Sequence, residues 1–296
     1  MIKPEAIHMR AYECRDERAE FLWNMYRNCS RNSQHSLVGP YLDIGTGDLT
    51  NALLFRKKAE FENAIGIDIE SPAERSREIA LVRGDARALP FRDGSFALVT
   101  MISLIEHLRE QALCVSEAAR VLRNRGELFM QLPNRYFPIE LHSGLFIYFF
   151  LPSFIRNRLA SYAGRSWMKN VDVPPLRKVM RIISESDSFR GVVTASFSYP
   201  ESLLPLSRWT IALYRLLKHL GILQIMPMGY VVLAHLSRVQ RNPDTRQRPT
   251  AKLHDATMQD APSEERHCNE RIPPRINSVN PHTAQVTSGG RIVRRL

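Results

Sequence analysis

The chain has 296 residues, of which 44% are hydrophobic and 24% charged, values typical of a soluble globular protein with one large domain and appendages, or with two small domains. No stretch reaches the roughly 18–20 apolar residues that a bilayer-spanning helix needs, and the first residues show no apolar run of the secretory kind. The four cysteines form no Cys-x-x-Cys pair, so neither a disulfide framework nor a metal site is expected, and a cytoplasmic location fits best.

The formal net charge is +11, but it is unevenly placed. Residues 237–296 contain eleven Arg or Lys, six Asp or Glu, and no Phe, Trp or Tyr. We expect this basic tail to be mostly disordered, because so few apolar groups cannot offset the entropy lost on ordering. The rest of the chain is only mildly basic, which argues weakly for nucleic acid as a partner and equally for ordinary surface charge.

Apolar strand-like segments alternate with helical patterns along the first 135 residues. In chain order we expect a helix over about 10–30, a strand over 37–44, a helix over 49–58, a strand over 62–70, a short helix over 71–80, a strand end at 81–86, a strand over 96–104, a helix over 109–124 and a strand over 126–134. Ser71 can cap the short helix, and Pro72 suits its first turn. This alternation predicts an α/β fold, a doubly wound and mostly parallel sheet with helices on both faces.

The second half of the chain continues the sheet after an irregular stretch. Residues 136–176 are first aromatic and then basic, and we expect them to form a lid or insertion beside the acceptor. Further elements are expected as a helix over 174–186, a strand over 191–199, a mostly helical segment between Pro205 and Gly221, and a strand over 229–236. We therefore predict one domain over residues 1–236, with its core at 38–135, followed by the tail.

Three motifs lie at the expected carboxyl ends of strands, where ligands bind in such sheets. In LDIGTGD, Gly45 and Gly47 allow positive φ and close approach of the backbone to a ligand, ahead of a helix N-terminus. Asp68, 21 positions after Gly47, can accept hydrogen bonds from both hydroxyls of a ribose. In GDARALPF, Asp85 can accept a bond from an adenine amino group, and the neighbouring backbone N–H can donate to a ring nitrogen.

These segments, with GDARALPFRDGSFALVTMISLIEHL and EAARVLRNRGELFMQLPN, resemble the successive motifs of class I methyltransferases over about residues 38–135. The resemblance implies a seven-stranded Rossmann-like sheet and a transferase that uses S-adenosylmethionine. The residues that it assigns to the cofactor are Asp43, Gly45 and Gly47 at the methionine end, Asp68 at the ribose, Asp85 and Ala86 at the adenine, and Ile102 and Ser103 beside the cofactor.

The glycine loop departs from the family pattern at its third position. The family loop usually reads Gly-x-Gly-x-Gly, and this chain has Leu49 where the last glycine would fall. A lesser departure is Ala97, where the family often has Asp. A nicotinamide oxidoreductase fits less well, because its Gly-x-Gly-x-x-Gly loop would need a glycine at position 50, where this chain has Thr50. That function also leaves the string GDARALPF unexplained.

Methyl transfer needs a general base only when the acceptor is a protonated hydroxyl or amine. The candidates are His107 at the end of the fourth strand, and Glu140 and His142 after the fifth, with His142 preferred. A packing role for His107 and a structural role for His142 are open alternatives.

The segment 145–155 combines aromatic residues, Phe149 and Phe150 among them, with basic residues just after it. This composition suits either a lid over the pocket or peripheral membrane contact with a lipid-linked acceptor. The leading hypothesis is methylation of a small-molecule or lipid-linked acceptor, at oxygen. Two alternatives are an inactive methyltransferase-like scaffold, motivated by Leu49, and an RNA methyltransferase, motivated by the net charge and opposed by the absence of an Asn-Pro-Pro-Tyr-like tetrapeptide.

Overall fold

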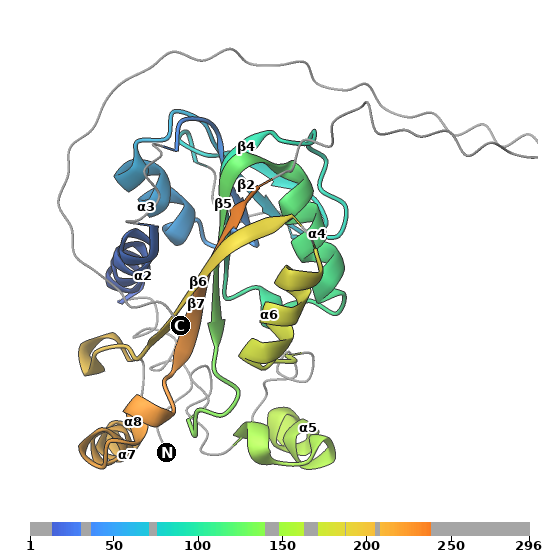
Figure 1. The fold of residues 1–296 in the computed structure, drawn as a ribbon. Coiled ribbons are helices and arrows are strands. Elements are labelled where there is room, and N and C mark those ends of the chain that lie inside the picture. Colours follow the sequence, from blue (N-terminus) through green and yellow to red (C-terminus); the bar gives the residue numbers. More distant parts are fainter. Residues whose placement is uncertain are drawn as a thin grey trace, which may run out of the picture. The chain divides into compact units, whose positions relative to one another are not determined.

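The computed structural model contains a seven-stranded sheet in the order β3-β2-β1-β4-β5-β7-β6 (Figure 1). The structure describes residues 14–30, 37–70, 76–139, 148–162, 171–186, 188–204 and 208–237. The strands are β1 Tyr41–Ile44, β2 Ala64–Asp68, β3 Ala80–Arg83, β4 Phe96–Ile102, β5 Leu122–Pro133, β6 Phe189–Phe197 and β7 Gly229–Leu236. Strands β1 to β5 pair in parallel, and β7 is antiparallel to both of its neighbours. The predicted α/β fold with a mostly parallel, seven-stranded sheet is confirmed.

Helices cover both faces of this sheet (Figure 1). The α-helices are α2 Arg15–Ser30, α3 Thr50–Ala59, α4 Gln111–Val121, α5 Ser153–Tyr162, α6 Leu176–Glu185, α7 Arg208–His219 and α8 Ile222–Ile225, with short 3-10 turns η1 Ile105–His107, η2 Tyr148–Phe150 and η4 Glu201–Leu203. Helices α2 and α3 lie on one face, and α4 and α6 lie on the other. The strand order reverses between β1 and β4, so the loops after these strands flank the switch point where ligands bind in open α/β sheets.

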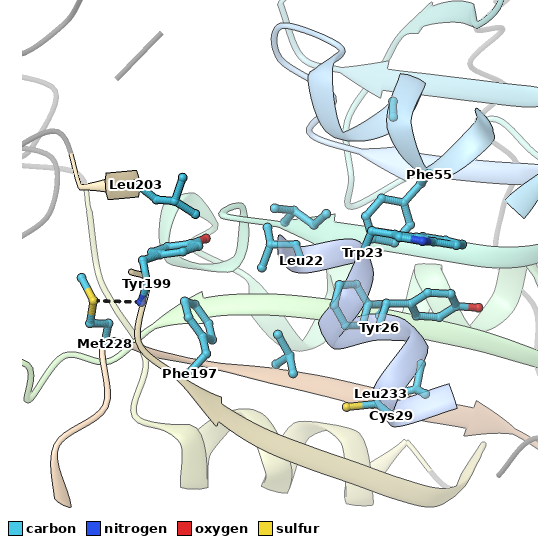
Figure 2. Packing of buried hydrophobic residues seen from close by; sticks show 14 of the residues in the cluster. Leu22, Trp23, Tyr26, Cys29, Phe55, Phe197, Tyr199, Leu203, Met228 and Leu233 are labelled. Atoms are coloured by element: carbon cyan, nitrogen blue, oxygen red, sulfur yellow. Dashed lines mark hydrogen bonds between the residues drawn. The ribbon is translucent and has the colours of Figure 1, made fainter. Parts of the chain in front are cut away.

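The face under α2 and α3 is rich in packed aromatic rings (Figure 2). Phe55 of α3 is fully buried, and its ring centroid lies 5.2 Å from that of Trp23, 5.6 Å from that of Tyr26 and 5.8 Å from that of Phe129. Aromatic pairs at these separations stabilise a core beyond the area that they bury. This layer fixes α3, and therefore the loop that precedes α3, against the central strands.

Of two expected helices, one is not helical in its described part and the other is shorter than predicted. Residues 71–75 lie outside the described residues, and the rest of the expected helix 71–80 is not helical, because the Ser76 hydroxyl accepts the N–H groups of Glu78 (3.0 Å) and Ile79 (3.3 Å) and β3 begins directly after this turn. The helix expected over 109–124 ends at Val121, since Leu122 already has extended backbone and pairs with Phe96 of β4.

The first strand is also shorter than the expected 37–44. Gly39 has φ +137°, a conformation that other residues rarely adopt, and Pro40 has no N–H to offer a neighbouring strand. Regular pairing therefore begins at Tyr41. Within the described residues no helix is long and apolar enough to cross a bilayer. The tail beyond residue 237 and residues 140–147 and 163–170 of the expected lid lie outside the described residues, so these domain boundaries stay predictions.

Candidate functional site

The loop between β1 and α3 is held by the neighbouring strand. The Gly45 N–H donates to the Ile67 carbonyl (2.8 Å), and the Gly47 N–H donates to the Asp68 carboxylate (3.0 Å). Both glycines have positive φ, +75° and +49°. A Cβ at Gly45 would lie 2.6 Å from Leu104 Cδ1, whereas a Cβ at Gly47 would meet nothing closer than 4.0 Å. The lack of a Cβ at Gly45 therefore lets Leu104, which follows β4, pack against the loop, whereas Gly47 borders open space.

Leu49 occupies the place of the family's third glycine, and it adopts the backbone that a glycine would adopt. Its φ of +69° lies in the left-handed region, its N–H donates to the Thr46 carbonyl (2.9 Å), and its carbonyl accepts from Leu53 (2.8 Å) to begin α3. A left-handed residue with a side chain costs about 1–2 kcal/mol. The Leu49 side chain is fully buried, which offsets that cost. The loop keeps its turn without the glycine, which weakens the motive for an inactive scaffold.

Substitution at Leu49 tests this balance. Leu49→Ala retains the strained backbone and loses the buried side chain, so it should destabilise folding by about 2–5 kcal/mol. Leu49→Gly loses the same packing but relieves the strain, so it should be the more stable variant by about 1 kcal/mol. Urea denaturation of both variants measures the difference, and an alanine variant more stable than the glycine variant would contradict a strained Leu49.

Asp43 lies in β1 as a buried carboxylate between two hydroxyl-bearing residues. The Thr100 hydroxyl of β4 donates to Asp43 Oδ1, and Thr100 also shares a hydrogen bond of 2.8 Å with the Tyr41 hydroxyl. Burial raises the pKa of Asp43 to about 6, outweighing the hydrogen bond from Thr100, which lowers it. Asp43 is therefore a buried acid that holds its proton to a higher pH than an exposed aspartate does.

The raised pKa predicts a defined pH dependence of stability. The native state keeps a proton on Asp43 between about pH 4 and 6, where the unfolded chain has already lost it, so this group lowers the free energy of unfolding as pH rises through that window. The total is about 3 kcal/mol. Asp43→Asn has no such proton, so its stability relative to wild type should rise from pH 4 to pH 7 and level off above. Denaturation at several pH values checks this, and parallel curves would contradict it.

Asp68 ends β2 and connects three parts of the site. Its Oδ2 accepts the Gly47 N–H, its Oδ1 accepts the Glu70 N–H (3.2 Å), and its carbonyl accepts the Gly84 N–H (2.8 Å). Each carboxylate oxygen has two lone pairs, so each retains one for a ligand hydroxyl. The loops after β1, β2 and β3 therefore meet around one acidic side chain at the carboxyl edge of the sheet.

The Asp85 carboxylate is engaged with a residue that the sequence analysis did not single out. The Arg87 guanidinium contacts both carboxylate oxygens, with Nη2 2.7 Å from Oδ2, and the Arg87 N–H donates to Oδ1 (2.9 Å). These hydrogen bonds hold the pKa of Asp85 below its usual value. Arg87 also reaches Glu110 (2.7 Å). The spacing of two residues in Asp-Ala-Arg was the available signal for this pair. The adenine role of Asp85 and Ala86 stays a prediction.

Ile102 and Ser103 lie where β4 ends. Ser103 has φ +50°, and its hydroxyl donates to Gln131 Oε1 of β5 at 2.7 Å, while its N–H reaches the same oxygen at 3.0 Å. Gln131 is a buried polar residue within the apolar run Leu128–Leu132 of β5, and this interruption was the available signal for it. Ser103 is thus fixed next to Leu104, which contacts the glycine loop.

The candidate bases are only partly visible. His107 ends the turn η1 after β4, is exposed, and donates its backbone N–H to the Leu104 carbonyl (2.9 Å), so it lies at the same edge as the cofactor candidates. Glu140 and His142 lie outside the described residues. The structure therefore brings Asp43, Gly45, Gly47, Asp68, Ser103 and His107 to one edge of the sheet, and their chemical roles stay predictions. In the described segments no group of three or more His, Cys, Asp or Glu could hold a metal ion.

Comparison with known proteins defines this edge further. The family model described as "Methyltransferase domain" matches residues 42–130, which include the loops after β1, β2, β3 and β4. Residues 42–130 therefore match the methyltransferase domain family. The resemblance to class I methyltransferases is confirmed over this segment, and the strand order of the whole sheet agrees with a Rossmann-like architecture.

Individual relatives match over the methyltransferase domain. A Mycobacterium tuberculosis protein named "Probable S-adenosylmethionine-dependent methyltransferase" is 36% identical over 97 residues, 32% of this chain and 35% of the relative. A ubiquinone/menaquinone biosynthesis C-methyltransferase of Ruegeria sp. is 34% identical over 110 residues, 31% of this chain and 43% of the relative. A methyltransferase structure from Archaeoglobus fulgidus has a TM-score of 0.49 at 18% identity, covering 75% of this chain and 94% of that one. The chain spans less than half the length of these curated relatives.

Proposed function

We propose that this chain binds S-adenosylmethionine at the carboxyl edge of β1, β2 and β4 and transfers its methyl group to a small-molecule acceptor. The observation that carries the proposal is the Asp68 carboxylate, which is anchored by the Gly47 N–H and keeps a free lone pair on each oxygen at the switch point of the sheet. A ribose offers two adjacent hydroxyls to such a carboxylate.

The other residues of the edge match the remaining groups of the cofactor. Gly47 has open space where a Cβ would be, so a ligand can approach the backbone there. Asp43 would face the cationic amino group, whose charge favours the ionised carboxylate. Asp85 and Ala86 would hold the adenine, and Ile102 and Ser103 would line the cofactor at the end of β4. When bound, the cofactor supplies an electrophilic methyl group on a positively charged sulfur.

The chain's own contribution is to bind and orient the two reactants. Holding reactants in line can supply much of a rate enhancement without further chemistry. The proton of a hydroxyl acceptor would pass to a base, for which His107, Glu140 and His142 are the candidates, with His142 preferred. The hydrogen bonds from Ser103 to Gln131 keep the end of β4 rigid beside the cofactor.

We propose a lipid-linked acceptor methylated at oxygen, and a cytoplasmic enzyme that meets its acceptor at the membrane surface. A second candidate is methylation at carbon of a quinone-like ring, favoured because one relative is named a C-methyltransferase of ubiquinone and menaquinone biosynthesis and another, from Thermus thermophilus, a demethylmenaquinone methyltransferase. Both candidates require an apolar acceptor, and they differ in the bond that forms.

Incubation with 13C-methyl S-adenosylmethionine and a panel of hydroxylated quinols or lipid-linked sugars tests the proposal. The 13C shift of the product separates an oxygen-bound from a carbon-bound methyl group. A methyl group bound to carbon would contradict methylation at oxygen and support the second candidate. Cofactor binding without any methylated product, in a panel that also contains RNA, would favour the scaffold alternative. Methylated RNA alone would favour the RNA alternative.

A further inference from the structure

Helices α7 and α8 expose large apolar side chains to solvent. Trp209 is 85% exposed, Leu216 52%, Leu220 60% and Ile225 83%. Positions 209 and 216 fall on one side of α7, and position 220, directly after the helix, continues that side, because seven and eleven residues correspond to nearly whole numbers of helical turns. The buried side of the same helix carries Tyr214 and Leu217, which belong to the aromatic core. The helix therefore has two apolar faces, and the protein's own core covers one of them.

The segment that carries this exposed face is basic. Residues 208–226 include Arg208, Arg215, Lys218 and His219 and contain no Asp or Glu. Arg215 Nε lies 2.7 Å from Glu201 Oε2, so that acid of η4 reduces the local charge of one arginine. Lys218 is exposed near the end of the helix, on the opposite side of α7 from Trp209, so it adds to the charge of the segment and not to the face itself. A face with an exposed tryptophan and leucines on a basic segment complements a negatively charged lipid surface.

The position of this face in the fold places it at the acceptor end. The Asn134 side-chain amide, just after β5, donates to the Pro227 carbonyl (2.8 Å), and its backbone N–H donates to the Met228 carbonyl (2.9 Å). Gly229 of β7 pairs with Pro133. These contacts bind the chain directly after α8 to the carboxyl end of β5. Figure 1 shows α5 at the same end of the sheet, and its Phe154 is also strongly exposed.

We propose that the exposed face of α7 and α8, formed by Trp209, Leu216, Leu220 and Ile225, docks onto the surface of an anionic lipid bilayer. The apolar side chains insert at the level of the headgroups, and the positive charge of residues 208–226 attracts the segment to the negatively charged surface. A surface that binds a partner protein would more often carry charges of both signs, whereas residues 208–226 contain basic residues and no Asp or Glu. The inference goes beyond methyl transfer, since docking needs no chemistry, and it would bring the carboxyl edge of the sheet to a lipid-linked acceptor.

Sedimentation of the full chain with vesicles tests the proposal. Wild type should bind vesicles that contain phosphatidylglycerol at least tenfold more tightly than vesicles of phosphatidylcholine alone. The double variant Trp209→Ser/Leu216→Ser should lose at least tenfold in affinity, and a high salt concentration should weaken the binding of wild type to the anionic vesicles severalfold. The matched control Val38→Ser/Leu113→Ser removes two exposed apolar side chains elsewhere and should bind as wild type does.

Two further measurements separate the possible explanations. The double variant should unfold at the wild-type temperature and bind S-adenosylmethionine as wild type does, so a failure of docking differs from a failure of the proposed activity. Binding of the double variant equal to wild type would overturn the proposal and assign any vesicle binding to the basic tail. A wild-type chain that does not sediment with the vesicles would also overturn it. The same holds if wild type forms a dimer, and the double variant dissociates that dimer without any effect on vesicle binding.

Discussion

Replacing Asp68 with alanine is expected to weaken the binding of S-adenosylmethionine by about tenfold to a hundredfold. The substitution removes the acceptor for the ribose hydroxyls, and a hydrogen bond to a charged group contributes about 1.5–3 kcal/mol, with a factor of ten for each 1.4 kcal/mol. It also removes the acceptor of the Gly47 N–H, which holds the glycine loop. Asp68→Asn retains one acceptor oxygen and should show an intermediate loss. Isothermal titration measures all three proteins.

Glu62→Ala provides the matched control for this experiment. Glu62 is an exposed acid that precedes the opposite end of β2, so its removal changes the net charge by the same amount at the far edge of the sheet. Its affinity for the cofactor should equal that of wild type. Equal affinities of Asp68→Ala and Glu62→Ala would remove Asp68 from the binding site.

Replacing Phe55 with alanine is expected to lower the free energy of unfolding by about 3–5 kcal/mol. Phe55 is fully buried, and its ring packs against those of Trp23 and Tyr26 (Figure 2). It also packs against the ring of Phe129, so the cavity left behind has rigid aromatic walls that cannot collapse easily. Chemical denaturation monitored by circular dichroism gives the difference. Because Phe55 fixes α3, cofactor affinity should fall with the same variant.

Phe154→Ala is the control for the loss of a phenylalanine ring. Phe154 of α5 is 70% exposed, and truncation of an exposed side chain away from the core changes stability by less than about 0.5 kcal/mol. A Phe55 variant as stable as this control would mean that the face under α2 and α3 is not the core that Figure 2 depicts.

The sheet could be predicted from the sequence because its strands are short apolar runs with turn residues between them. The last strand, expected over 229–236, was found at those residues. Its side chains alternate between the hydrophobic cores on the two faces of the sheet. Boundaries set by single side chains were missed. The Ser76 hydroxyl forms a turn in the described part of the segment expected as helix 71–80, and Leu122 takes extended backbone inside a segment with helical periodicity. Neither effect changes the spacing of apolar residues along the sequence, so that spacing cannot reveal it.

The candidate site was predictable where backbone geometry demands a residue type and less so where partners are distant. Gly45 and Gly47 were found because positive φ and close approach require glycine. Leu49 departs from the family's glycine pattern, but burial of its side chain holds it in the left-handed conformation that a glycine would adopt. A sequence motif contains no information about that burial. The contact of Ser103 with Gln131 joins residues 28 positions apart, so the sequence could suggest only that a buried polar residue needs a partner.

The most direct test of the central claim is isothermal titration of the full wild-type chain with S-adenosylmethionine and S-adenosylhomocysteine, with the thermal unfolding temperature as a second readout. The account predicts saturable binding of one molecule per chain for both compounds, and an unfolding temperature that rises with the concentration of each. A folded chain that releases no heat and shows no shift with either compound would contradict a cofactor site at the carboxyl edge of β1, β2 and β4.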